Sequence, residues 1–140
     1  MKFNILIDTG FWIALFDPRG NPHQEMEVER IAEVIKDENF VIPFPTLYEF
    51  VNSRLSRRGS KIQFENILKS PNVQLLSDDE YKEEALENFF LNSKHSNLDI
   101  SLVDEILKLI IIDPNVNIDY IVSFDDGLVN AAMALGIRNI

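Results

Sequence analysis

The chain has 140 residues, of which 46% are hydrophobic and 26% are charged, and it contains no cysteine. This length predicts one domain over residues 1–140. No apolar stretch reaches the ~20 residues of a membrane helix, and the apolar start is too short for a signal peptide. Since the lack of cysteine also excludes disulfides, we expect a cytoplasmic location. The net charge of −10 argues against nonspecific binding to a polyanion, because phosphate contacts need lysine and arginine.

The first half of the chain alternates short apolar runs with amphipathic segments. Apolar, β-branched runs predict strands, and apolar residues at helical spacing predict helices. Asn21 as cap and Pro22 as first residue favour the start of a long amphipathic helix. The predicted elements are a strand at 2–7, a buried helix at 9–16, a helix at 22–37 with Met26, Ile31, Val34 and Ile35 inward, a strand at 40–42, a helix at 46–57 with Leu47, Phe50, Val51 and Leu55 inward, and a helix at 60–69.

The second half continues the alternation. It predicts a strand at 73–76, an acid-rich helix start at 78 with the helix reaching 92, a helix at 101–112 before Pro114, a strand at 119–123, a helix at 127–135 and a short strand at 137–140. Strands that alternate with helices, each a continuous apolar run, indicate a parallel sheet covered on both faces. We therefore predict a three-layer α/β/α sandwich, in which ligands bind beyond the carboxyl ends of the strands.

Acidic residues occur where this fold would place a site. Asp8 follows the first predicted strand directly, and Asp125 and Asp126 follow the fourth. Glu49 and Asp104 lie near the starts of predicted helices, which we expect at the same end of the sheet as the carboxyl ends of the strands. Gathered carboxylates repel each other unless a cation lies among them, and oxygen ligands without cysteine or nearby histidine select Mg²⁺ or Mn²⁺. Such ions support phosphodiester hydrolysis, so the pattern points to phosphate chemistry.

Four segments resemble the motifs of PIN-domain nucleases. The first is Ile7-Asp8-Thr9-Gly10-Phe11-Trp12, a strand that ends in Asp before a helix of small and apolar residues. The others are Thr46-Leu47-Tyr48-Glu49, Ser101-Leu102-Val103-Asp104 and Ser123-Phe124-Asp125. Each is weakly specific alone, but all four occur in the family's order, between Ile5 and Asp126. The length is also similar to that of free-standing members, many of which are VapC toxins of toxin–antitoxin pairs.

This resemblance implies a function and a set of site residues. Asp8, Glu49, Asp104 and Asp125 would be the catalytic and metal-binding residues, Asp126 an extra ligand, and Thr9 and Ser123 supporting residues. The chain would be a Mg²⁺- or Mn²⁺-dependent endoribonuclease that leaves a 5′-phosphate on one product. RNA would be its substrate, and an antitoxin protein and a second copy of the chain are candidate partners.

Each acid also has a purely structural interpretation. Thr46 with Glu49, and Ser101 with Asp104, fit capping boxes, in which the acid bonds the N–H of the cap residue. The acids that follow the strands would cap the helices after them. Caps alone give no reason for four motifs to occur in one family's order, and this favours the metal site.

One segment departs from the acidic background. Residues 50–77 contain five basic residues and one acid, a local charge of +4 against −14 for the rest of the chain. Arg54, Arg57, Arg58 and Lys61 would grip the phosphates of RNA, beginning five residues after Glu49. The alternative is a solvated helix end, which basic residues also favour.

Other functions compete with the nuclease. A PIN-like fold that has lost catalysis and binds RNA or protein agrees better with the charge of −10. A receiver-like signalling domain also has acids at strand ends, but no lysine directly follows the strand at 119–123. A ribonuclease with His23 and His95 as acid and base is a third alternative.

Overall fold

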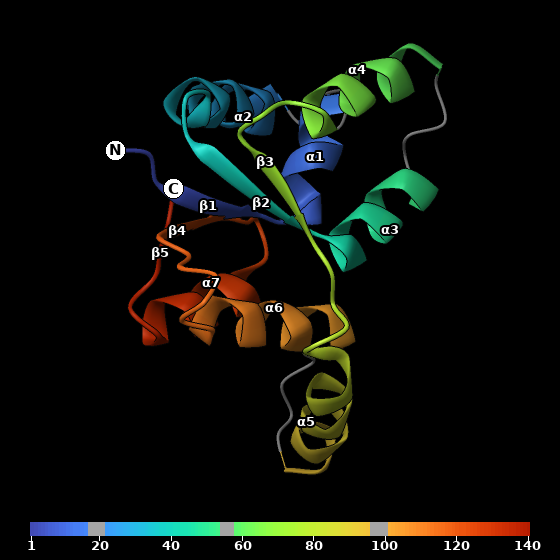
Figure 1. Ribbon diagram of the computed structural model, residues 1–140, viewed down its shortest axis with the longest axis vertical. Coiled ribbons are helices and arrows are strands. Elements are labelled where there is room, and N and C mark those ends of the chain that lie inside the picture. The colour runs from blue at the N-terminus through green and yellow to red at the C-terminus, as the bar shows by residue number, and fades with distance from the viewer. Residues whose placement is uncertain (17–21, 54–57, 96–100) are drawn as a thin grey trace.

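A five-stranded sheet lies between two layers of helices in the computed structural model, which describes residues 1–16, 22–53, 58–95 and 101–140 (Figure 1). The strands are β1 (Asn4–Ile7), β2 (Asn39–Pro43), β3 (Val73–Leu76), β4 (Tyr120–Val122) and β5 (Arg138–Asn139). Their order is β3-β2-β1-β4-β5, and all four pairings are parallel. The prediction of a three-layer sandwich with a central parallel sheet is confirmed.

Two apolar clusters fill the spaces on either side of the sheet, because alternate residues of a strand face opposite ways. Ile5 and Ile7 of β1 belong to one cluster and Leu6 to the other. The first cluster lies under α1 (Thr9–Phe16), α2 (Pro22–Ile35), α3 (Phe44–Ser53) and α4 (Arg58–Leu68), and the second under α5 (Lys82–His95), α6 (Leu102–Ile112) and α7 (Asp126–Ala134). Among the described helices, none has the length and apolar character needed to cross a bilayer.

Two predicted core faces were partly wrong. In α2, Met26 is 72% and Val34 55% exposed. Among the α2 residues whose side chains the structure describes, Val28, Ile31 and Ile35 are buried. At about 100° per residue, Met26 lies on the opposite side from this stripe and Val34 about a quarter-turn away. In α3, Leu47 and Phe50 are buried as predicted, but Val51 is 45% exposed, and Leu55 lies outside the described residues.

Helix α5 extends away from the body of the domain, beyond α6 in Figure 1. Just before its first turn, the Tyr81 hydroxyl donates to Asp113 Oδ2 at 2.6 Å. Farther along, Asn92 Nδ2 donates to Glu105 Oε1 at 2.7 Å, and Lys108 Nζ lies 3.2 Å from the same oxygen. Glu105 is only 2% exposed, so these two donors satisfy a carboxylate that would otherwise be buried without partners. The two contacts attach α5 to both ends of α6.

Candidate metal centre

The direction of the chain across the sheet reverses between β1 and β4. From β1 the chain proceeds to β2 and β3 on one side, whereas β4 and β5 lie on the other. Asp8 follows β1, and Ser123 and Asp125 follow β4. The backbone N–H of Asp8 donates to the carbonyl of Val122 at 3.0 Å, which holds the two strand ends together. Such a switch point is where open α/β sheets bind their ligands.

Asp8 is the most buried of the acids at this point, with 8% of its surface exposed. Its Oδ1 accepts from the Thr9 backbone N–H at 2.8 Å, and its Oδ2 accepts from the Ser123 hydroxyl at 2.9 Å. The same Ser123 oxygen accepts from the Asp125 backbone N–H at 3.0 Å, so Ser123 connects the first and fourth motifs. Burial raises the pKa of Asp8, and the charge of Asp125 adds to this rise, while the two hydrogen bonds to Asp8 oppose it.

Glu49 is connected to Asp8 through Thr9, whose hydroxyl donates to Glu49 Oε1 at 2.9 Å. The capping-box interpretation of Glu49 is wrong. Helix α3 begins at Phe44, before Thr46, and the Thr46 hydroxyl donates to the Pro43 carbonyl at 2.7 Å. Partial burial raises the pKa of Glu49, and the charge of Asp8 raises it further, against the hydrogen bond from Thr9.

Asp104 lies in the first turn of α6, where Ser101 is the N-cap. The Asp104 N–H donates to the Ser101 hydroxyl at 3.0 Å, so half of the predicted capping box forms. Burial is the main reason that the pKa of Asp104 is raised to about 7. A side-chain hydrogen bond with Asp125 and the charges of Asp125 and Asp8 raise it as well. Near neutral pH, Asp104 is therefore about half protonated, beside the carboxylate of Asp125.

Asp125 has a structural duty in addition to its place beside Asp104. It is the N-cap of α7, and its Oδ1 accepts from the Gly127 N–H at 3.2 Å. Asp126 is exposed in the first turn of the same helix. The capping interpretation is thus correct for Asp125, but it does not exclude a metal, because a carboxylate has a second oxygen free to act as a ligand.

The four acids form a row of neighbouring charges at the carboxyl ends of β1 and β4, which we call the acidic rim. Along this row Glu49 interacts with Asp8, Asp8 with Asp125, and Asp125 with Asp104. Within the described part of the chain, none of the four acids forms an ion pair with a basic side chain, and no three acidic or histidine side chains are already spaced to hold one ion. That all four reach a common ion stays a prediction. The donor set nevertheless fits a hard cation, since it consists of oxygens whose mutual repulsion a cation would relieve.

One supporting residue was not predicted. Asn139 of β5 accepts from the Ser123 N–H at 3.0 Å through Oδ1 and donates from Nδ2 to the Ser123 carbonyl at 3.1 Å. This reciprocal pair fixes the backbone of Ser123, and hence the hydroxyl that bonds Asp8. The sequence contains no motif around Asn139; only the pairing of β5 with β4 brings it to the site.

The predicted basic patch is only partly described. Arg54 and Arg57 lie outside the described residues, as do the side chains of Arg58, His23 and His95. Lys61 is exposed on α4. Arg58 begins α4 and therefore belongs to a different helix from Glu49.

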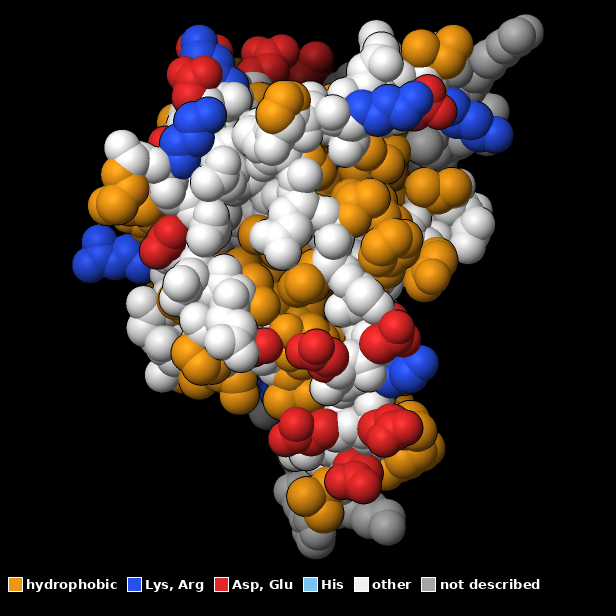
Figure 2. Space-filling model, in the orientation of Figure 1, with side chains coloured by type: hydrophobic (Ala, Val, Ile, Leu, Met, Phe, Trp, Pro, Cys, Tyr) orange, Lys and Arg blue, Asp and Glu red, His pale blue; other side chains and the backbone are white. Residues whose placement is uncertain are grey.

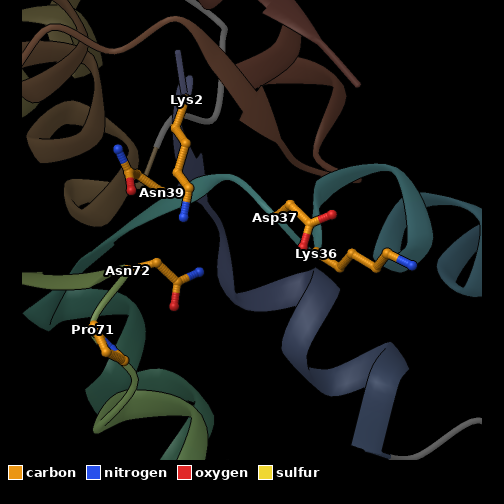
Figure 3. Close-up of a pocket in the computed structure, with 6 residues that line it drawn as sticks. All are labelled: Lys2, Lys36, Asp37, Asn39, Pro71 and Asn72. Carbon is orange, nitrogen blue, oxygen red and sulfur yellow. The ribbon is translucent and has the colours of Figure 1, made fainter.

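A polar cavity of about 340 Å³ lies at the opposite edge of the sheet, at the amino ends of the strands. It is lined by Lys2, Lys36, Asp37, Asn39, Pro71 and Asn72. Lys2 extends between Asn39 and Asn72, while Lys36 points away (Figure 3). Asp37 is the one carboxylate in this lining, so the cavity lacks the set of acidic metal ligands that the acidic rim offers.

Comparisons with known proteins agree with this geometry. The family model of the PIN domain matches residues 5–133. The fold is similar to a chain in the crystal structure of VapBC2 from Rickettsia felis bound to a DNA fragment from their promoter, with a TM-score of 0.61 and 11% sequence identity, covering 99% of this chain and 98% of that chain. No curated protein sequence matches this chain.

Proposed function

We propose that this chain, which belongs to the PIN domain family, is a Mg²⁺- or Mn²⁺-dependent endoribonuclease. The observation that carries the proposal is the row of carboxylates at the switch point, connected by the hydroxyls of Thr9 and Ser123. The raised pKa values of Asp8, Glu49 and Asp104 support it, because they reflect partly buried carboxylates to whose pKa the neighbouring acids also contribute.

Each residue has a role in this proposal. Asp8, Glu49, Asp104 and Asp125 would hold the ion, with Asp126 as an extra ligand. When bound, the ion would supply an activated water and stabilise the charge on the leaving oxygen. Thr9 and Ser123 orient Glu49 and Asp8, which is the usual duty of groups that bond metal ligands from behind.

The proposed partners follow from the family and from the local positive charge of residues 50–77. RNA is the substrate, gripped by Arg54, Arg57, Arg58 and Lys61. VapBC2 is a two-component assembly in the similar structure. By analogy we propose an antitoxin protein as partner, a homodimer as the assembly of this chain, and the cytoplasm as its location.

The experiment that tests the proposal is cleavage of single-stranded RNA by the wild type and by Asp8→Asn, with Mg²⁺ or Mn²⁺ and with EDTA. Asn keeps the shape of the side chain and one acceptor but removes the charge that attracts the cation. We expect no cleavage by Asp8→Asn or in EDTA, and wild-type activity for the matched control Asp37→Asn, an exposed acid at the opposite edge of the sheet. Equal cleavage by wild type and Asp8→Asn would refute the assignment of the site.

A catalytically inactive binding module is the second candidate. It is favoured by the absence, in the described part of the chain, of three acids already spaced for one ion. The same assay separates the two: RNA that is bound but never cleaved, with either ion and with varied sequences, would support the binding module.

A further inference from the structure

An exposed aromatic side chain lies directly beside the acidic rim. Tyr48 precedes Glu49 in α3, so their Cα atoms are about 3.8 Å apart. The two side chains diverge by about 100° around the helix axis. Glu49 faces Thr9 and interacts with the charge of Asp8, while the ring of Tyr48, on the adjacent face of the helix, is 61% exposed.

The packing around Tyr48 holds its ring in place without covering it. Phe44, one turn earlier, packs against the core, and its ring lies 6.2 Å from the ring of Tyr48 at an angle of 46°. Within the described residues the Tyr48 hydroxyl makes no hydrogen bond, and the Phe44 contact is its one specific interaction. The fold itself therefore gives no reason for a tyrosine at this position.

The surface around Tyr48 has the character of a single-strand binding surface. Figure 2 shows hydrophobic side chains over α3, with Lys and Arg side chains over α4 above them and Asp and Glu side chains below. The exposed apolar residues of α3 are Tyr48 and Val51, and Lys61 is exposed on α4. Proteins that bind single strands combine aromatic rings, on which bases stack, with cations that follow the backbone.

We propose that Tyr48 is a stacking platform for an unpaired nucleobase next to the phosphate to be cleaved. This inference rests on the proposed function. A base in a duplex is stacked on its neighbours and has no free face for the ring, whereas an unpaired base offers one. Every base has such a face, so the platform tolerates different sequences.

The first test measures binding in EDTA, where no cleavage occurs, with labelled A6 RNA and an abasic hexamer of the same charge as probes. Stacking of one base on an aromatic ring is worth about 5- to 150-fold in affinity. We expect the wild type to prefer A6 over the abasic chain by a factor in this range, and Tyr48→Ala to bring the ratio close to one. Tyr48→Phe should keep the preference, because it keeps the ring.

The matched control is Phe90→Ala, which removes an aromatic side chain that is 56% exposed on α5, and it should leave the ratio unchanged. In the cleavage assay, Tyr48→Ala should raise KM by the same factor and change kcat less than about twofold. A wild type that cleaves RNA but shows the same base preference with and without the Tyr48 ring would overturn this inference alone. A wild type that neither binds nor cleaves RNA would overturn the proposed function with it.

Discussion

Protonation of Asp104 should make metal binding depend on pH. With a pKa of about 7 in the metal-free protein, Asp104 must lose its proton before it can act as a ligand. Lowering the pH from 8 to 6 reduces the ionised fraction of such a group from about nine tenths to about one tenth, so the apparent association constant of Mn²⁺ should fall about tenfold. Binding at pH 6 should also release close to one proton.

Isothermal titration of Mn²⁺ into the protein measures both quantities, when it is repeated in buffers with different ionisation enthalpies. Asp104→Asn should bind the ion more weakly and release no proton at pH 6. Asp37→Asn should behave like the wild type, since Asp37 lies at the opposite edge of the sheet. The reasoning is refuted if the wild type binds Mn²⁺ equally well at pH 6 and pH 8, or if Asp104→Asn releases as many protons as the wild type.

Three further predictions concern stability and RNA binding. In EDTA, protonated Asp104 contributes stability that is fully present below the unfolded pKa of about 3.8 and is lost as the pH rises through the folded pKa of about 7. Thermal melts should therefore show a steeper fall in Tm between pH 5.5 and pH 8 for the wild type than for Asp104→Asn. Parallel falls in Tm would contradict this prediction. Asn139→Ala should lower the free energy of unfolding by about 1 kcal/mol, measured by urea denaturation, because two part-buried hydrogen bonds to Ser123 are lost. It should also reduce the rate of RNA cleavage while the protein stays folded, and full activity would show that Ser123 does not need this support. Replacing Arg58 and Lys61 together by Ala should weaken RNA binding. It should also reduce the slope of log affinity against log salt concentration by the equivalent of up to two phosphate contacts. An unchanged slope would support the interpretation of this segment as a solvated helix end.

Much of the fold was predictable because its signals are local. The segment Thr9–Phe16 has the predicted bounds as α1, and Val73–Leu76 has them as β3. Continuous apolar runs were sufficient to indicate a parallel sheet, since such strands are buried on both faces. The order of the strands was not predictable, because nothing local to β1 shows that β4, more than 110 residues later, pairs with it.

The site shows the same division between local and distant information. Asp8, Glu49, Asp104 and Asp125 were predicted from motifs, and their role at a metal site stays a prediction. The structure adds that the Ser123 hydroxyl donates to Asp8. Thr46 was taken for a helix cap because its spacing from Glu49 fits one, but α3 extends two residues farther back. Asn139 was missed because its contribution depends entirely on which strand lies beside β4.

The central position of β1 has a consequence for synthesis of the protein on the ribosome. Asp8 is made more than 110 residues before the strand that completes its surroundings, β4, which begins at Tyr120. Domains fold as units, and contacts between residues so distant in sequence form late. An unfinished chain that ends before β4 has Asp8 and Glu49 but lacks Ser123 and Asp125. The nascent polypeptide is therefore incomplete at the site until β4 has been made, and the ribosome that makes it is not exposed to a finished acidic centre before then.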